Sequence, residues 1–438
     1  MSTAPSLASS DSEPAGRSRA LVGAGLVFAA FNLRATIAAV APVLTQVQRS
    51  DGLSSAGAGV LTSVPIVCFG AFALATPALL RRTSAHRLLW LAVAGVAAGT
   101  VLRSLPGLAA LFAGTFLFGA AIGVGNVVLP ALIKREFPRH VALLTGLYAM
   151  ALSAGAALAA GVTVPIEHLA GVSWRLALLC WAGPAVLALV FWSPSGGAQR
   201  GRGPAQRGRG PAGRGRGGTR AGSGGAQRGS GGAQRPGVEP HAAPLYRSGL
   251  AWAVTAVMGL QSLSFYALFS FVPALLESDG MGGTTAGALL AVSQIASLLA
   301  AFVTPTLARR LRRSWWAVGA AVGLNAVALG GLAAHPHGTV PVLVWMLAMG
   351  AGQGSILSQA LGFIVLRAPN SDQAANLSTM AQGAGYLVAA TGPFTVGALH
   401  QLTRGWDVPL AVLGAALVVE LAAGIVASGD RHVPAAPP

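Results

Sequence analysis

Long apolar runs, separated by short polar segments, form the main pattern along this chain. A helix needs about 20 mostly apolar residues to cross the hydrocarbon core of a bilayer, because each residue adds about 1.5 Å. The pattern therefore predicts an all-α membrane protein with about twelve transmembrane helices. The predicted spans are 20–44, 57–80, 88–105, 107–133, 141–166, 172–193, 248–276, 284–308, 314–334, 340–366, 376–400 and 406–427.

The composition supports a membrane environment. Of the 438 residues, 53% are hydrophobic and only 9% are charged, whereas a soluble domain has about 25% charged residues. The segment 1–19 has no short apolar core followed by a cleavage site, so we expect no cleaved signal peptide. Both cysteines, Cys68 and Cys180, lie in predicted spans, which indicates neither a disulfide framework nor a metal site.

The formal net charge of +17 is concentrated in a few connections between spans. Basic residues follow the second, fourth and eighth predicted spans, and nine arginines lie in the Gly-rich connection after the sixth. By the positive-inside rule these connections and both termini face the cytoplasm. The central connection, 194–247, repeats Gly-Arg-Gly and has no apolar face. We expect a disordered linker there, able to touch anionic lipid but without a specific nucleic-acid partner.

The two halves of the chain match in order. The Arg-Arg pair at 81–82 corresponds to the pair at 309–310, and Gly-Val-Gly-Asn at 123–126 corresponds to Gly-Ala-Gly-Gln at 350–353. Two six-helix pseudo-repeats of this kind are typical of secondary transporters, which bind solute between the halves near the membrane midplane. The expected parts are an N-terminal tail at 1–19, bundles at 20–193 and 248–427, the linker at 194–247 and a C-terminal tail at 428–438.

Arg34 is the most unusual residue of the first predicted span. Placing a charged arginine at the centre of a membrane helix costs roughly 2.5 to 3.5 kcal/mol on insertion scales. No carboxylate is near it in the sequence, and its five N–H donors suit a small anion through charge-assisted hydrogen bonds. We therefore predict that Arg34 contacts an anionic substrate. Backbone carbonyls, or a distant acid such as Glu420, are the alternative partners.

Further polar residues within the predicted spans are candidate substrate contacts, because unsatisfied polar groups are costly in lipid and tend to face a cavity or another helix. Ser262 and Tyr266 are spaced i,i+4 and share a helix face, as do Gln382 and Tyr386. The alternative role for each is a hydrogen bond between helices. The candidate substrate-binding residues are Arg34, Asn32, Asn126, Gln261, Tyr266, Gln353, Gln382 and Tyr386.

Acidic residues are scarce in the predicted spans, where only Glu420 is clearly intramembrane. A proton-coupled cation or drug antiporter normally needs a central carboxylate, so the pattern favours an anionic or neutral polar solute. His400 can titrate near neutral pH, but the sequence leaves the mode of coupling open. No cluster of nucleophile, base and orienting group occurs in the spans, and no phosphate-binding motif. We therefore expect neither an enzyme nor a bound cofactor.

Several segments carry a resemblance to a known family. In the first half and the seventh span they are FNLRATI at 31–37, APVL at 41–44, GNVVLPALIKR at 125–135 and GLQSLSFY at 259–266. In the second half they are GQG at 352–354, RAP at 367–369, MAQGAGY at 380–386 and GP at 392–393. With these segments the chain resembles the cyanate permease and 2-nitroimidazole transporter family of the major facilitator superfamily. The resemblance implies a twelve-helix carrier of small anions or polar compounds in the cytoplasmic membrane.

The sequence thus predicts a monomeric secondary transporter that moves a small, cyanate-like anion or polar solute by alternating access. Two alternatives stay open. One is a carrier of neutral nitroaromatic or drug-like compounds, and the other is a transporter-like sensor that signals through the linker. A carrier would move solute with the linker deleted, whereas a sensor would bind ligand without useful flux.

Overall fold

The computed structural model describes residues 14–137, 141–191, 245–310, 314–335, 338–369 and 371–433, and the elements within these ranges are helical. The first group is α1 (Pro14–Ala38), η1 (Ala41–Val43), α2 (Leu44–Asp51), α3 (Ser55–Arg82), α4 (Ala85–Arg103), α5 (Leu108–Glu136), α6 (Val141–Ala170), α7 (Trp174–Leu179) and α8 (Ala182–Phe191). The second group is η3 (Leu245–Arg247), α9 (Gly249–Ser278), α10 (Gly283–Arg310), α11 (Ser314–Ala333), α12 (Thr339–Leu366), α13 (Ser371–Thr403) and α14 (Asp407–Ala427).

The described helices include 10 that are long and apolar enough to cross a membrane. A shorter apolar stretch, Trp174–Val190, combines α7 and α8. The remaining long helix, α13, has 33 residues and carries several polar side chains, which include Gln373, Gln382 and Thr391. Together these elements follow the predicted order of spans. The expectation of an all-α membrane protein with about twelve spans is confirmed.

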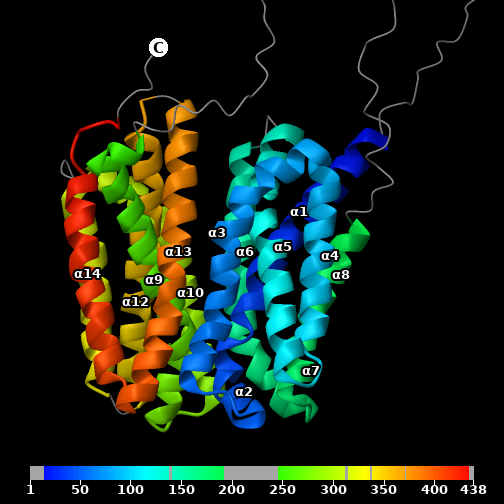
Figure 1. The fold of residues 1–438 in the computed structure, drawn as a ribbon, viewed down its shortest axis with the longest axis vertical. Helices are drawn as coiled ribbons and strands as arrows, with labels where there is room; N and C mark the ends of the chain where they lie inside the picture. The colour runs from blue at the N-terminus through cyan, green and yellow to red at the C-terminus, as the bar shows by residue number, and fades with distance from the viewer. Residues whose placement is uncertain are drawn as a thin grey trace, which may run out of the picture.

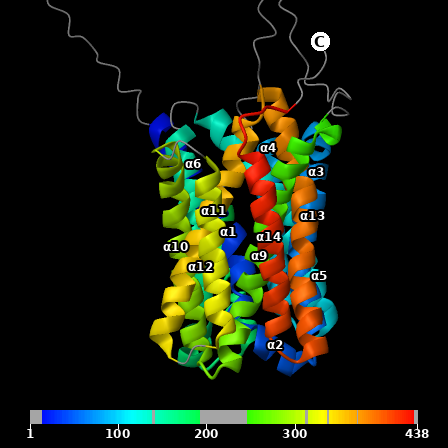
Figure 2. The same ribbon diagram turned by 90° about the vertical axis from the view of Figure 1, so that its left-hand side faces the viewer.

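The helices form two groups that lie side by side, with α1 to α8 in one and α9 to α14 in the other (Figure 1). In the first group α1 packs on α6 and α8, and α4 packs on α5. In the second group α10 packs on α12, and α9 packs on α13 and α14. The groups meet where α3 packs on α13 and where α6 packs on α10. Figure 2, which turns the second group toward the viewer, shows α10, α12, α14 and α13 along its outside.

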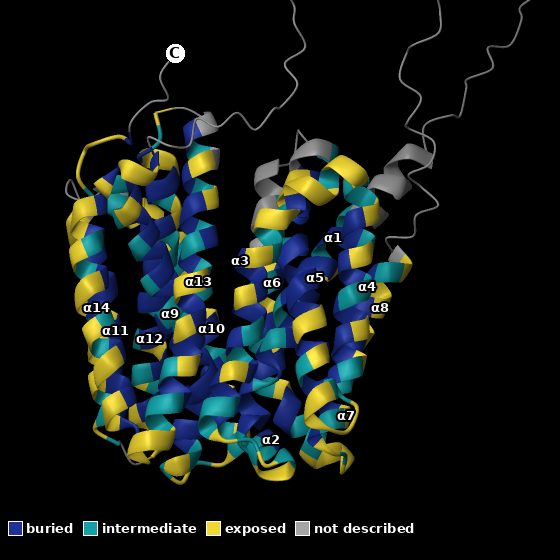
Figure 3. Cartoon of the chain, viewed as in Figure 1, coloured by how far each residue is buried: buried dark blue, intermediate teal, exposed yellow. Residues whose placement is uncertain are grey.

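Large apolar side chains are exposed on the outward faces of the helices (Figure 3). Val303 and Val418 are each more than half exposed, with relative exposures of 60% and 69%. A soluble monomer rarely exposes large apolar patches, whereas lipid makes such surfaces stable. This surface agrees with the hydropathy of the sequence and identifies a multi-pass membrane protein.

The two ends of the helix bundle differ in charge and in packing. We call the end that holds Arg81, Arg82 and Arg87, where α3 ends and α4 begins, the basic end. The other, where α2 lies (Figure 1), is the opposite end. Small residues bring the groups together there: a Cβ on Gly59 of α3 would lie 2.6 Å from the Pro393 carbonyl oxygen of α13. Such small residues let helix backbones approach closely in membranes.

The expected linker at 194–247 lies outside the described residues apart from its last three, Leu245–Arg247. Most of the two predicted tails lies outside them as well. The structure therefore describes the two bundles, and the predicted properties of the linker stay predictions.

Candidate functional site

Arg34 lies on α1, one turn before this helix ends at Ala38, and its side chain is half-buried. Within the described part of the chain its guanidinium makes no hydrogen bond and no ion pair. The guanidinium carbon lies 5.6 Å from the centre of the Phe265 ring and 5.8 Å from that of Tyr266. These rings offer cation–π attraction but no conventional hydrogen-bond acceptor for the N–H groups. The N–H donors of Arg34 are therefore available to a ligand.

Three of the four tyrosines of the chain gather around Arg34. Tyr148 of α6, Tyr266 of α9 and Tyr386 of α13 each lie close enough to interact electrostatically with the guanidinium. Phe69 of α3 packs on two of them, with ring centres 6.3 Å from Tyr266 and 6.2 Å from Tyr386. We call Arg34, Phe69, Tyr148, Phe265, Tyr266 and Tyr386 the Arg34 cluster. Its members come from both helix groups.

The chemistry of the Arg34 cluster suits a small anion or a group with several acceptor atoms. The guanidinium offers a planar fork of N–H donors, and each phenol offers an O–H donor. The aromatic walls keep the local dielectric low, which strengthens hydrogen bonds to a ligand that enters. The salt bridges found in the described residues involve other side chains, so Arg34 keeps its charge without a protein counter-ion there.

Two predicted site residues, Arg34 and Tyr266, are in direct contact, and Tyr386 belongs to the same cluster. Asn32 instead makes hydrogen bonds within the first helix group. It is buried, its Nδ2 donates to the Trp181 carbonyl oxygen at 3.3 Å, and its Oδ1 accepts from the Thr36 hydroxyl at 3.0 Å. Through these contacts Asn32 joins α1 to the bend that separates α7 from α8.

The other four predicted residues are spread over α5, α9, α12 and α13. Asn126 is half-buried beside Gly125, which packs on Leu33 of α1. The Gln261 Oε1 accepts from the Ser262 hydroxyl at 3.1 Å, and the Gln382 Nε2 donates to the Ser378 hydroxyl at 2.7 Å. Gln353 is buried, and its Oε1 has no hydrogen-bond partner among the described residues. Their role in binding substrate stays a prediction.

Tyr148 and Arg103 were missing from the residues predicted from the sequence. Arg103 ends α4 and is fully buried, at 0% exposure. Its Nη1 donates to the Thr36 carbonyl oxygen at 2.8 Å. This carbonyl is free because the Val40 N–H bonds to Ile37 where α1 breaks. A charge inside the third predicted span was visible in the sequence, so the signal was the same as for Arg34.

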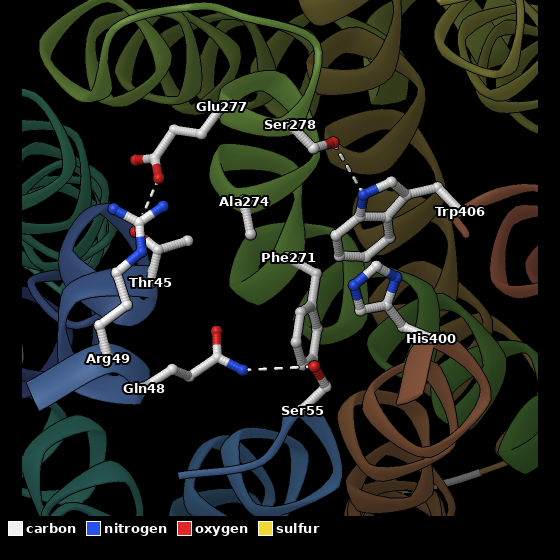
Figure 4. Close-up of a pocket in the computed structure, with 10 residues that line it drawn as sticks. All are labelled: Thr45, Gln48, Arg49, Ser55, Phe271, Ala274, Glu277, Ser278, His400 and Trp406. Carbon is white, nitrogen blue, oxygen red and sulfur yellow. Dashed lines mark hydrogen bonds between the residues drawn. The ribbon is translucent and has the colours of Figure 1, made fainter. Parts of the chain in front are cut away.

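A second candidate site is a cavity of about 380 Å³ at the opposite end, between the two helix groups (Figure 4). Arg49 of α2 and Glu277 of α9 point toward one another across it (Figure 4). The Thr45 hydroxyl donates to the Glu277 carboxylate at 2.6 Å, which joins the groups. The full lining is Thr45, Gln48, Arg49, Ser55, Phe271, Ala274, Glu277, Ser278, His400 and Trp406.

We call this cavity the outer cavity. An apolar layer separates it from Arg34. Along α9, the cluster residue Tyr266 is followed by Phe269 and Ser270, and only then by Phe271 and Glu277 of the outer cavity. Tyr266, Phe269 and Ser270 line a small cavity of about 30 Å³, together with mainly apolar residues of α1, η1, α2, α3 and α5. A solute in the outer cavity therefore reaches Arg34 only if this layer opens.

The family model described as "Major Facilitator Superfamily" matches residues 26–393 of the chain. The chain belongs to the Major Facilitator Superfamily. The expectation from the sequence motifs is thereby confirmed, and so is the choice of a transporter over an enzyme. The protein is a major facilitator transporter of small solutes.

Two named relatives cover most of this transporter. It is 34% identical to the 2-nitroimidazole transporter of Escherichia coli (strain K12) over 95% of this chain and 98% of the relative. It is 28% identical to the cyanate transport protein CynX of the same organism, over 87% of this chain and 90% of the relative. Among solved structures, a bacterial homolog of the human lysosomal transporter Spinster matches with a TM-score of 0.71 at 16% identity, over 97% and 100% of the two chains. That structure supports the fold alone.

Proposed function

We propose that this major facilitator transporter carries a small, cyanate-like anion across the cytoplasmic membrane and binds it at the Arg34 cluster. The observation that carries the proposal is a half-buried guanidinium that has no hydrogen-bond or ion-pair partner among the described residues and is surrounded by tyrosines from both helix groups. An anion at this point replaces the missing counter-ion with charge-assisted hydrogen bonds. Its contacts to Tyr266 and Tyr386 then join the two groups around the bound solute.

Alternating access follows from the position of the site. At the opposite end the two groups are joined by the Thr45–Glu277 hydrogen bond and by the Ala56 N–H, which donates to the Gln401 side-chain oxygen at 3.0 Å. Both bonds, and the glycine contacts beside them, have to break before solute exchanges with that side. We propose that the basic end faces the cytoplasm, in keeping with the positive-inside rule, and that the protein works as a monomer.

A second candidate substrate is a neutral nitroaromatic compound. The Arg34 cluster has walls of Phe69, Phe265 and Tyr386, which suit a flat ring. A nitro group presents two oxygens to a guanidinium in the same planar arrangement as a carboxylate. One relative is named for 2-nitroimidazole. This substrate uses the same cluster, and the third alternative, a sensor, binds ligand there without flux.

The test is uptake into liposomes by the purified protein, with labelled cyanate, nitrite, bicarbonate and 2-nitroimidazole as separate solutes. We expect saturable uptake of an anion that falls on the order of 100-fold in Arg34→Gln, since the loss of charge-assisted hydrogen bonds costs about 3 kcal/mol. Saturable uptake of 2-nitroimidazole alone supports the second candidate. Binding of these solutes without flux supports the sensor, and normal anion uptake by a well-folded Arg34→Gln protein contradicts the proposal.

A further inference from the structure

Phe265 borders both Arg34 and a small cavity in the second helix group. One contact of its ring is the Arg34 guanidinium, 5.6 Å from the ring centre. The same side chain lines a cavity between α9, α10 and α12, where Gln353 also lies. Phe265 is half-buried and stacks on Phe269 at 5.6 Å between ring centres. The Phe265 side chain therefore lies next to the Arg34 guanidinium and next to the cavity that Gln353 lines.

Close packing of α10 on α12 builds this cavity. A Cβ on Gly350 would clash with the Ser293 carbonyl oxygen, and one on Gly354 would clash with that of Ser297. The two glycines are spaced i,i+4, so they lie on one face of α12 and let it approach α10. Gln353 lies between them in sequence, and this approach brings it beside the polar side chains of α10.

Ser293 and Gln294 of α10 are hydrogen-bonded to each other, whereas the Gln353 side-chain oxygen has no such bond among the described residues. The Ser293 hydroxyl donates to the Leu290 carbonyl oxygen at 2.7 Å and accepts from the Gln294 Nε2 at 3.4 Å. The Gln353 Oε1 is buried and has no partner among the described residues. A buried oxygen of this kind requires a hydrogen-bond donor. The cavity that Gln353 lines holds about 10 Å³, close to the room for one water-sized group.

We infer that this cavity is a subsite for an N–H or O–H group of the transported solute, reached when the Phe265 ring turns aside. The solute then has an anionic or acceptor end at Arg34 and a donor end at the Gln353 side-chain oxygen. The inference rests on the proposed function and narrows its substrate class to small anions that carry a hydrogen-bond donor. Such a solute contacts α1 of one helix group and α12 of the other, and so joins the two groups.

Two matched pairs of anions test the subsite at two distances between the carboxylate and the hydroxyl group. Glycolate and acetate differ at one end by a hydroxyl group, as do 4-hydroxybenzoate and benzoate. Dissociation constants are measured by titration calorimetry on the purified, monodisperse protein. We expect the hydroxyl member of at least one pair to bind at least tenfold more tightly than its partner, because a site built around a hydrogen bond rejects the analogue that lacks it.

Variants of two glutamines on the same helix separate this role from packing. Gln353→Leu, with Gln353→Met as a second apolar replacement, should abolish the preference for the hydroxyl member while binding of the partner anion changes little. Gln359→Leu is the matched control, since Gln359 is also a buried residue of α12 but lies away from the cavity and donates to the Ala317 carbonyl oxygen at 3.1 Å. It should keep the preference. In Phe265→Ala the preference should be retained or increased, because the aromatic ring no longer covers the cavity.

Each other outcome overturns the inference. Equal affinity of both members in both pairs, or a preference that survives in both Gln353 variants, excludes the subsite and leaves the Arg34 proposal intact. Equal loss of the preference in Gln359→Leu assigns the effect to packing of α12. If none of the four anions binds, the subsite is wrong, and the proposed function fails with it only if cyanate, nitrite and bicarbonate also show no uptake dependent on Arg34.

Discussion

Arg34 and Arg103 are two arginines of the same helix group with different surroundings. Arg103 is fully buried, donates to the Thr36 carbonyl oxygen of α1 and lies 4.9 Å from the Phe118 ring centre. Its contacts all belong to the first group. Arg34 is half-buried, donates to no described residue, and contacts Phe265 and Tyr266 of the second group. Arg103 makes its hydrogen bond within its own bundle, where its Nε and Nη2 are buried without a partner among the described residues. Arg34 faces the partner bundle, and its donors are open to a ligand.

If Arg34 binds the solute as proposed, burial alone does not identify a substrate-binding charge in a membrane protein. Arg103 supplies a donor that the backbone lacks where α1 breaks, so it positions the helix that carries Arg34. Arg34 lies where the two groups meet, and only a group that enters between them can pair with its donors. The position of a charge relative to the moving interface therefore decides its role.

Among the variants that conserve the charge or the ring, the largest effect is expected when each arginine is exchanged for lysine. Arg34→Lys keeps the charge but loses the planar fork, so we expect KM for the transported anion to rise about tenfold. Arg103→Lys keeps a charged donor near Thr36 and should change KM less than about threefold. Uptake kinetics in liposomes measure both variants. A larger rise of KM in Arg103→Lys than in Arg34→Lys reverses the assignment of the two residues.

The next effect concerns the tyrosines of the Arg34 cluster. Tyr266→Phe and Tyr386→Phe each remove one O–H donor while keeping the ring, and a lost hydrogen bond of about 1 kcal/mol raises KM roughly fivefold. Tyr246→Phe is the matched control, because Tyr246 is the fourth tyrosine and is 53% exposed outside the cluster. Unchanged KM in both cluster variants, measured by the same uptake assay, means that the phenols do not contact the solute.

A smaller effect concerns the closed contacts at the opposite end. Thr45→Val removes the hydroxyl that donates to Glu277, which should favour opening by about 1 kcal/mol, or roughly fivefold in the conformational equilibrium. Ser270→Cys, in a background without Cys68 and Cys180, reports on the apolar layer through its labelling rate with a membrane-impermeant thiol reagent. We expect faster labelling when Thr45→Val is added. Equal labelling rates indicate that the Thr45 bond does not hold the layer closed.

The smallest effect concerns His335, which lies beyond the end of α11. A hydrogen bond to the Asp279 carboxylate, 2.8 Å away, raises the pKa of His335 above its ordinary value of 6.5. The charged histidine therefore stabilises the fold fully below pH 6.5, and this contribution is lost as the pH rises through the raised pKa. His335→Asn should lower the melting temperature at pH 6 and leave it unchanged at pH 9. The difference should be below about 1 kcal/mol, because the pair is partly exposed.

Much of the fold follows from the sequence because hydropathy and small residues act locally. The apolar runs predicted the helices, and the cost of a charge in the first span singled out Arg34. The neighbours of Arg34 were harder to predict, because Tyr148 and Phe69 reach it through packing between distant helices. Asn32, two residues away, was also among the predicted site residues and is instead held by Trp181 and Thr36. Arg103 was not singled out, because it lies two residues before the end of its predicted span, and its burial against Phe118 and Thr36 depends on packing between helices.

The central claim is that the donors of Arg34 bind the transported anion and those of Arg103 do not. It is tested most directly by equilibrium binding of the anion identified by uptake to purified wild type, Arg34→Gln and Arg103→Gln. The account predicts on the order of 100-fold weaker binding in Arg34→Gln and a change below about threefold in Arg103→Gln. Wild-type affinity in a folded Arg34→Gln protein, or an equal loss in both variants, would contradict it.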